Sequence, residues 1–357
     1  MATGNYVTGG PKAALGNSSG ASEREDLANY ISMITRDDTP FVSSIGKNKA
    51  KAILHEWQTD ELRAPGVNAQ AEGVDYADLT QTQNFRTRLG NYTQIFAEAI
   101  SVSNTKRKVD QAGVADEFAY QLKKVGTEMR RDLEFTLVQS WQEKNGSGTR
   151  TMGGVHSYAT DALVYDATFG GFANDGGNFN GVFDGSGTFA GVNPGNTGVA
   201  DVEVDIDLTH IDEVQQRVYE EGGKSTRVMV SPKNRRKISE QAQLAGSNVR
   251  REIGASGKLR QSVDIYESDF GEVMIVPNYV MGTGGVAGAG PLFATTNPDD
   301  FTAICYDPMW FNVTTLRPMH ETDVGPKGDS TIGMLVEECT FEAKNPKGFG
   351  LIVNIGL

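Results

Sequence analysis

The sequence predicts an α+β fold, and three observations lead to that prediction. Residues 108–141 carry the longest uninterrupted helical pattern in the chain. Residues 51–64 and 84–103 have the alternation of two strands that leave the body of the protein and return to it. The C-terminal stretch from residue 310 onward has a β pattern throughout, and a compact α/β segment precedes it. Strands and helices in separate stretches are typical of α+β proteins.

The composition is that of a folded protein without a dominant nucleic-acid surface. Hydrophobic residues make up 38% and charged residues 22% of the 357 positions, so we expect a packed core. The formal net charge is −13, whereas tight binding of phosphates requires clustered basic residues. The sequence has no apolar run long enough for a membrane span and no apolar signal-peptide centre near residue 1. We therefore expect a chain that is made in a cytoplasm and has no membrane contact.

The N-terminal part is predicted to be an arm followed by a short helix. Residues 1–22 are rich in Gly, Ser, Asn and Ala and cannot bury enough apolar surface to become ordered. Ser22 and Glu25 have the spacing of a capping box and predict that a helix begins there. Pro40 disfavours helical geometry at Thr39, so the helix is expected to end before it.

The next sixty residues predict a long ribbon. In the first arm, Trp57 lies on the same side as His55, and in the returning arm Phe85 alternates with Arg86 and Arg88. At about 3.3 Å per residue each arm would reach roughly 40 Å. A two-stranded ribbon of that length is not stable alone in water, and few apolar residues lie within it. We infer that it lies on another copy of the chain.

The helix at 108–141 is amphipathic and has no residue suited to catalysis. Its charged residues fall off the apolar stripe, so one face is expected to pack and the other to contact water. Counted from residue 107 to residue 144, it would span about 55 Å. The stripe consists of Ala115, Phe118, Leu122, Val125, Met129, Leu133, Leu137 and Trp141.

A Gly-, Asn- and Phe-rich tract at 166–200 is predicted to be a surface insertion before the α/β segment. In that segment a helix is expected to begin with Thr209 as its N-cap and to end at Gly222. A buried strand follows at 226–231, and a second helix begins with Pro232 in its first turn. This pattern predicts one compact layer of helices on a sheet.

The search for catalytic and metal sites finds only weak candidates. Cys305 and Cys339 lie in apolar, β-branched surroundings and are expected to be small buried hydrophobic residues. The glycines at 282–290 precede Pro291 and a strand, which favours a connecting loop over a phosphate site. Single, scattered histidines are expected to be ordinary, partly exposed side chains: His55, His156, His210 and His320.

Two charged clusters leave alternatives open. Glu203, Asp205 and Asp207 would share one face of an extended strand and could bind Ca²⁺ or Mg²⁺, although a solvated strand face is favoured. The basic run at 233–237 includes Arg235 and Arg236. It is expected to be a solvated face or an inter-subunit salt-bridge partner, with DNA contact as the less favoured alternative.

The order of these segments resembles that of the major capsid proteins of tailed double-stranded DNA phages, which have the Hong Kong 97-like fold. The likeness rests on "EDLANYISMITRDDTPFVSSIG", "VADEFAYQLKKVGTEMRRDLE", "GTRTMGGVHSY" and "VMVSPKNRRKIS". It covers the chain apart from the insertion. The resemblance implies an N-terminal arm at 1–45, an extended loop (the β-ribbon) at 46–104, a peripheral domain with a spine helix at 105–150 and 305–357, a Gly-rich insertion at 151–204, and an axial domain at 205–304.

The resemblance also implies a function. The chain would assemble with itself through pentamers and hexamers into the icosahedral shell of a virion, after synthesis in the host cytoplasm. It would meet a portal and a separate scaffolding protein, leave room for a decoration protein, and touch packaged DNA non-specifically. No enzymatic activity, catalytic residue, cofactor or metal is expected. Inter-subunit contacts are expected at Trp57, Phe85, Arg86, Arg88, Arg235 and Arg236.

Two other functions compete with this one. A calcium-binding secreted adhesin or surface-layer protein would use Glu203, Asp205 and Asp207, but the sequence has no apolar signal segment. A metal-dependent hydrolase would need the same carboxylates, and no paired base or nucleophile accompanies them. Some members of the resembled family cross-link a Lys to an Asn, but we expect no cross-link from Lys49 or Lys51 at the base of the ribbon.

Overall fold

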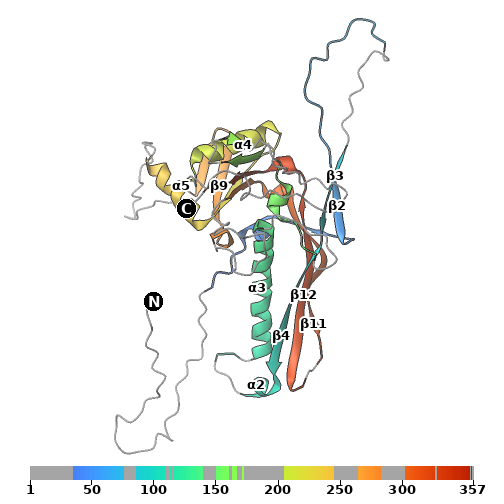
Figure 1. The fold of residues 1–357 in the computed structure, drawn as a ribbon, viewed down its shortest axis with the longest axis vertical. Coiled ribbons are helices and arrows are strands. Elements are labelled where there is room, and N and C mark those ends of the chain that lie inside the picture. Colours follow the sequence, from blue (N-terminus) through green and yellow to red (C-terminus); the bar gives the residue numbers. More distant parts are fainter. Residues whose placement is uncertain are drawn as a thin grey trace, which may run out of the picture.

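The computed structural model describes residues 35–75, 86–109, 113–114, 116–139, 150–160, 163–166, 171–172, 205–244, 264–282, 302–325, 328–353 and 355. These residues form two sheets, a short ribbon and three longer helices, arranged as an elongated molecule with a loop that extends from one end (Figure 1). The predicted arm at 1–22 and the predicted helix that follows it lie outside the described residues. The mixture of helices and sheets confirms the α+β prediction.

A four-stranded sheet forms the lower half of the molecule in Figure 1. Its order is β1 (Gly46–Lys49), β11 (Phe311–Asp323), β12 (Ser330–Ala343) and β4 (Gln94–Ser103). β1 runs parallel to β11, and the other neighbours are antiparallel. β11 and β12 are therefore the two inner strands, and β12 pairs with a segment that is distant in the sequence, β4.

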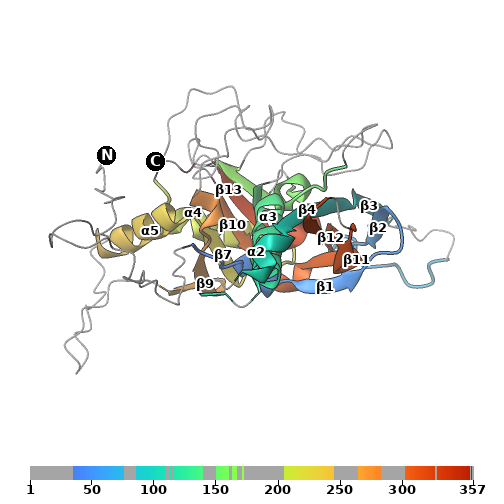
Figure 2. The ribbon, with the colours of Figure 1, turned by 90° about the horizontal axis from the view of Figure 1, so that it is seen from below.

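Helix α3 (Glu117–Gln139) lies lengthwise along this sheet (Figures 1 and 2). Its 23 residues span about 34 Å. The predicted stripe is confirmed for its described residues, because Val125, Met129, Leu133 and Leu137 are buried and Phe118 and Leu122 are partly buried against the same core. Ala115 and Trp141 lie outside the described residues.

The predicted start of this helix at residue 108 is wrong. A separate short helix, α2 (Asn104–Lys108), ends at the extended residue Val109, and Gly113 has a positive φ of 85°. A left-handed residue breaks the run of helical dihedral angles, so the long helix begins only at Glu117. The span of about 55 Å that we expected was too long for this reason.

The ribbon is also shorter than predicted. β2 (Leu54–Thr59) pairs antiparallel with β3 (Thr87–Tyr92) as a two-stranded sheet. The predicted returning arm was a single strand, but Thr93 separates β3 from β4, and β4 pairs with β12 instead of β2. Only part of the returning arm therefore belongs to the ribbon.

A seven-stranded sheet forms the second half of the molecule, in the order β6-β5-β13-β10-β7-β9-β8. Helices α4 (Leu208–Glu220) and α5 (Pro232–Leu244) pack against it. This segment confirms the buried strand and the helix that begins at Pro232. The strands are β5 (Val164–Asp166), β6 (Gly171–Phe172), β7 (Arg227–Val230), β8 (Ile265–Ser268), β9 (Gly271–Pro277), β10 (Ala303–Tyr306) and β13 (Gly350–Val353).

Alternation along the central strands divides the buried residues into two cores. Val228 and Val230 face the core under α4 and α5, whereas Met229 faces the core shared with α3. Cys305 and Ile304 on β10 divide in the same way. Four 3-10 helices complete the described structure: η2 (Val155–Tyr158), η5 (Val280–Gly282), η7 (Pro308–Trp310) and η8 (Pro346–Gly348).

Segment boundaries in the structure differ from those expected. Residues 163–166, which we assigned to the insertion, contribute β5 to the seven-stranded sheet and carry buried side chains such as Leu163. β10 and β13, which we largely assigned to the peripheral domain, lie in that sheet as well. The C-terminal strands thus contribute to both sheets.

The two sheets meet at an aromatic core around helix α1 (Pro40–Ser44). Thr39 is non-helical, as predicted from Pro40, but Pro40 begins a helix here. Phe41 is fully buried, with its ring 5.4 Å from that of Tyr306 and 5.6 Å from that of Phe311. Helix α1 therefore fills the junction between the sheets.

A buried carboxylate holds α1 in place. Glu134 of α3 accepts hydrogen bonds from the backbone N–H groups of Phe41 at 2.9 Å and Val42 at 2.8 Å. It also accepts one from Nδ2 of the buried Asn278 at 2.7 Å, just after β9. Burial raises the pKa of Glu134 above its usual value. The hydrogen bonds and the positive charge of Arg130 act in the opposite direction but do not cancel this rise. One side chain thus joins α1, α3 and the seven-stranded sheet.

Candidate assembly interface

The most exposed apolar side chains in the described structure lie on the chain that leaves the ribbon. We call residues 60–75 the distal loop; they form no helix or strand and run away from both sheets (Figure 1). Leu62 is 96% and Val67 97% exposed. No described residue of their own subunit covers them, so this loop presents apolar surface far from either core.

Ion pairs fix the start of the distal loop. Lys347 of η8 lies 2.9 Å from Glu61 and 3.0 Å from Glu221 at the end of α4. The hydrogen bond to Glu61 raises the pKa of Lys347, and Glu221 raises it further. Burial acts in the opposite direction but does not cancel this rise. Arg86 lies 3.4 Å from Asp60, and so braces the point where the chain returns.

The ribbon is anchored by its own subunit. The ring of Trp57 lies 5.6 Å from that of Tyr158, whose hydroxyl donates to the Gly90 carbonyl at 3.0 Å. Asn91 is fully buried and donates to the carbonyls of Gly153 at 3.0 Å and Phe341 at 2.9 Å. The ribbon is therefore a rigid base, and the projection begins beyond Thr59.

Two buried glutamates of β12 hold the segments around the ribbon. Glu338 binds Arg317 at 2.8 Å, Arg150 at 3.0 Å and the Thr93 hydroxyl at 2.8 Å. Glu342 is surrounded by donors, and although burial alone would raise its pKa, their hydrogen bonds lower the pKa of Glu342 to about 2. The donors to Glu342 are His55, Asn312, Thr314 and Asn48.

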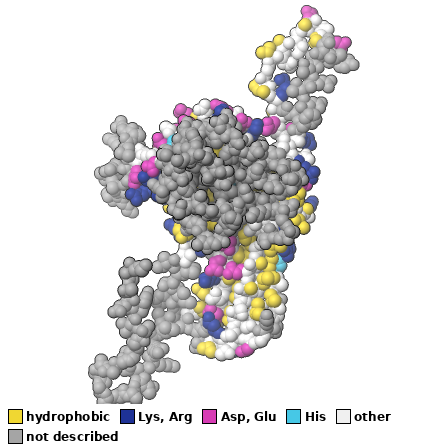
Figure 3. Space-filling model, in the orientation of Figure 1, with side chains coloured by type: hydrophobic (Ala, Val, Ile, Leu, Met, Phe, Trp, Pro, Cys, Tyr) yellow, Lys and Arg dark blue, Asp and Glu magenta, His cyan; other side chains and the backbone are white. Residues whose placement is uncertain are grey.

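The face of the four-stranded sheet that lies away from α3 has an apolar surface. Ile95, Ala97 and Ala99 are exposed on β4, and Met334 is half-buried opposite Ala99 on β12. Figure 3 shows hydrophobic side chains gathered beside charged surface in the lower half of the molecule. We call the face formed by Ile95, Ala97, Ala99 and Met334 the sheet patch.

The remaining predicted contact residues are occupied within the chain or lie outside the described part. Phe85 lies outside it. Arg88 pairs with Glu56, and Arg236 donates to Glu240 at 2.8 Å while remaining 82% exposed on its side chain. Arg235 binds Asp264 and the Ile275 carbonyl. The structure thus places Trp57 and Arg88 on opposite faces of the ribbon, Arg86 just before β3, and the two arginines Arg235 and Arg236 on α5.

The predicted carboxylate face does not form. Asp207 is the N-cap of α4, which also corrects our assignment of Thr209 to that role, and its carboxylate accepts from the Leu208 N–H. Asp205 pairs with Lys237 at 3.0 Å, and Glu203 lies outside the described residues. Across the described residues no group of three His, Cys, Asp or Glu side chains could hold a metal ion. Two of the three carboxylates named in the calcium and hydrolase alternatives, Asp205 and Asp207, therefore have partners within the chain.

The cysteines and histidines add no reactive cluster. Cys305 and Cys339 are buried and free, as predicted, and burial raises the pKa of the Cys305 thiol to about 12. His156 is fully buried, contrary to our expectation, and this burial lowers its pKa to about 3. His210 completes the capping box of α4. Within the described part of the chain, no helix has the length and apolar character needed to cross a membrane.

Comparison with known proteins identifies the family. The family model described as SU10 major capsid protein matches residues 6–356. The major capsid protein of Escherichia phage Phieco32 is 38% identical over 113 residues, which is 31% of this chain and 32% of that protein. The chain therefore matches about a third of the length of this curated relative.

Solved structures show the same fold at low sequence identity. A capsid structure of the cyanophage P-SCSP1u has a TM-score of 0.55 and 10% identity, and covers 95% of both chains. Mycobacterium phage Ogopogo gives a TM-score of 0.58, with 10% identity over 93% of this chain and 96% of that one.

An encapsulin complex from Synechococcus elongatus PCC 7942 also matches, with a TM-score of 0.51, 9% identity and coverage of 94% of this chain and 92% of that one. At such identities the solved structures establish only the fold. The family is identified by the family model, which matches residues 6–356. By its fold and by a family match over nearly its whole length, the chain belongs to the SU10 major capsid protein family.

Proposed function

We propose that copies of this chain assemble through rings of five and six into the icosahedral shell that encloses the double-stranded DNA of a tailed phage. Family membership supports a structural capsid role. A shell repeats the same contact between many copies and closes by symmetry, so each copy needs a donor surface and a matching acceptor surface. The described structure offers one candidate for each.

The observation that carries the proposal is the distal loop. Leu62 and Val67 are almost fully exposed on a segment that forms no helix or strand in its own subunit. Burial of a Leu or Val side chain contributes roughly 1.5–3 kcal/mol. We infer that the distal loop of one subunit lies on the sheet patch of the next, which would bury both apolar surfaces.

The domain assignment follows the two sheets. We assign α3 and the four-stranded sheet to the peripheral domain, and the seven-stranded sheet with α4 and α5 to the axial domain around ring centres. The paired, exposed side chains of Ile265 and Met274 at the edge of that sheet support such a contact. The insertion would then begin after β6.

The contact residues divide by role in this proposal. Arg86 and Arg88 would approach the neighbour as charged contacts and Phe85 would add an apolar one, whereas Trp57 would position the ribbon by packing on Tyr158. Arg236 remains exposed enough to meet an axial neighbour, and Arg235 would hold the α5 end in position.

The wider setting is proposed from the family. The chain would be a virion component without a catalytic role, made in the host cytoplasm and assembled on a separate scaffolding protein around a portal. A decoration protein would bind the finished shell.

The test is a double variant, Leu62→Asp with Val67→Asp. Because both side chains are exposed in the subunit, its free energy of unfolding should change by less than about 0.5 kcal/mol. Uncompensated charges in the contact should lower the yield of shells at least roughly tenfold in electron micrographs. The control Leu62→Met with Val67→Ile should assemble normally. Normal shells from the Asp variant would refute the assigned contact.

A further inference from the structure

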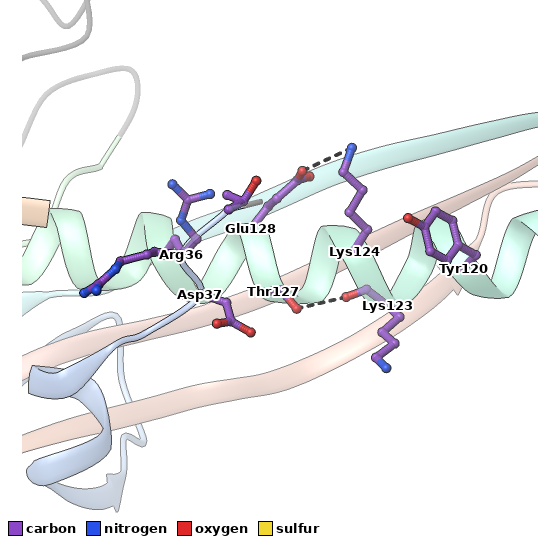
Figure 4. Close-up of a pocket in the computed structure, with 9 residues that line it drawn as sticks. Arg36, Asp37, Tyr120, Lys123, Lys124, Thr127 and Glu128 are labelled. Carbon is purple, nitrogen blue, oxygen red and sulfur yellow. Dashed lines mark hydrogen bonds and ion pairs between the residues drawn. The ribbon is translucent and has the colours of Figure 1, made fainter. Parts of the chain in front are cut away.

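A groove lies between α3 and the segment that precedes α1. Residues 35–37 run beside α3 and enclose a space of about 310 Å³. Figure 4 shows side chains from both segments around it, including Arg36, Lys123, Lys124 and Thr127. The groove belongs to the charged side of α3, opposite the buried stripe that packs on the sheet.

The groove has the opposite charge to the molecule as a whole. It is lined by four cations, Arg36, Lys123, Lys124 and Arg131, and two carboxylates, Asp37 and Glu128. The complete chain carries a net charge of −13. A local excess of positive charge in an acidic protein is therefore a feature of this surface.

These cations are less neutralised than the basic run on α5. Among the described residues, Lys123 and Arg131 make no salt bridge, although the charge of Arg131 acts on the neighbouring Asp132. Arg36 lies 3.7 Å from Asp38, in a pair that is exposed on both sides. Lys124 lies 3.5 Å from Glu128 in a pair that is exposed on both sides, and such pairs contribute little. On α5, by contrast, Arg235, Arg236 and Lys237 each bind a carboxylate.

The spacing of the groove residues fits a regular polyanion. Lys123, Thr127 and Arg131 follow one another at four-residue intervals, so they lie on one face of α3. Eight residues of helix span about 12 Å. One strand of DNA carries a phosphate about every 3.4 Å along the axis, so this face matches about three or four phosphates.

We propose that this groove binds the sugar–phosphate backbone of double-stranded DNA, without reading its sequence. The inference rests on the proposed function, in which the shell encloses DNA, and it assigns the charged side of α3 to the shell interior. Backbone contacts position a protein without specifying bases. The acidic remainder of the chain would keep the contact local and weak.

The test measures binding of a fluorescent 24-base-pair duplex by the full chain between about 50 and 200 mM salt. The variant Lys123→Gln, Lys124→Gln, Arg131→Gln should lose at least tenfold in affinity at the lower salt. The slope of log affinity against log salt should become shallower by about two to three, since each phosphate contact contributes about 0.9. The variant Lys123→Arg, Lys124→Arg, Arg131→Lys should retain binding.

A matched control removes three exposed cations elsewhere: Lys47→Gln, Lys49→Gln and Lys51→Gln on and beside β1. It should bind DNA within twofold of the unaltered chain. Equal losses in the two triple variants, unchanged binding in the groove variant, or no binding by the unaltered chain would overturn the proposal. Electron microscopy separates the two claims, because shells that assemble without DNA affinity would leave the proposed function intact while this inference failed.

Discussion

Glu134 is a charged residue with no access to solvent, and its position explains why the structure tolerates it. A buried carboxylate is costly unless donors surround it. Here two backbone N–H groups and the Asn278 amide take that role. The same bonds satisfy the first N–H groups of α1, which would otherwise be unpaired beside the aromatic core. Glu134 therefore stabilises the junction of the two sheets.

Replacing Glu134 by Ala should destabilise the subunit by about 3 kcal/mol, because three buried donors lose their acceptor. Urea denaturation of the unassembled chain measures this change. Glu128→Ala on the exposed side of the same helix is the control and should cost less than about 0.5 kcal/mol. A loss below about 1 kcal/mol for Glu134→Ala would contradict the role assigned to this carboxylate.

Glu342 should make stability depend on pH in the acid range. Its pKa is lowered from 4.5 to about 2 in the folded chain. The stabilisation is therefore fully present above pH 4.5 and is lost as the pH falls towards 2. A shift of this size corresponds to about 3 kcal/mol.

The measurement compares the unaltered chain with Glu342→Gln in urea at pH 7 and pH 3. The difference in unfolding free energy should be largest at pH 7 and should shrink at pH 3. Glu72→Gln, on the exposed distal loop, should show no such dependence. A difference that stays constant between the two pH values would argue against the hydrogen-bonded, ionised Glu342.

Single residues also show where sequence reasoning falls short. Asp207 was predicted to lie on a strand face, but it caps α4, because an Asp one residue before a helix satisfies its free N–H groups. His156 looked like an ordinary surface histidine, and its burial depends on η2 packing against distant residues. The N-cap role of Asp207 can be recognised from the local sequence, whereas the burial of His156 becomes visible only in the tertiary structure.

At the scale of elements, the predictions succeeded where one short pattern decides the outcome. The apolar stripe of α3 and the apolar run Val228–Val230 of β7 are local signals, and the described residues of both are buried as predicted. The end of the ribbon was missed because β4 continues the alternation of β3 without a Gly or Pro between them. The strand changes sheets only because β12, some 240 residues later, provides its partner.

The candidate interface, too, was predicted only where a short local pattern marks it. The sequence located the excursion and its arginines, since alternation and turn residues mark them. It did not identify Leu62 or Val67, because isolated apolar residues in a polar stretch are common on surfaces. Their importance comes from their exposure on a projecting loop, which only the structure shows.

Deleting residues 60–85 should separate folding from assembly. The ribbon ends at Thr59 and Thr87, so a short Asn-Gly turn can join its strands, and the anchoring contacts of Trp57 and Asn91 remain. We expect a folded subunit, by circular dichroism, that forms no closed shells. Normal shells from this deletion would refute the role of the extended loop. A second variant, with a shuffled sequence of equal length at 60–85, tests whether the length of the loop alone is enough for shell assembly.

For the whole molecule, the architecture agrees with the task of a thin shell subunit. Two sheets joined at one buried junction give an elongated body whose edges and projecting loop are available to neighbours (Figures 1 and 2). No chemical motif predicted this role. It came from the order of segments, and the family match over residues 6–356 confirmed the family.

The most direct measurement is electron microscopy, combined with sedimentation velocity, of the full chain expressed alone and with a co-expressed scaffolding protein. The account predicts closed icosahedral shells, or rings of five and six subunits that convert to shells when the scaffold is present. A monodisperse monomer or a small closed oligomer under both conditions would contradict it, because the distal loop would then have no neighbouring subunit to contact.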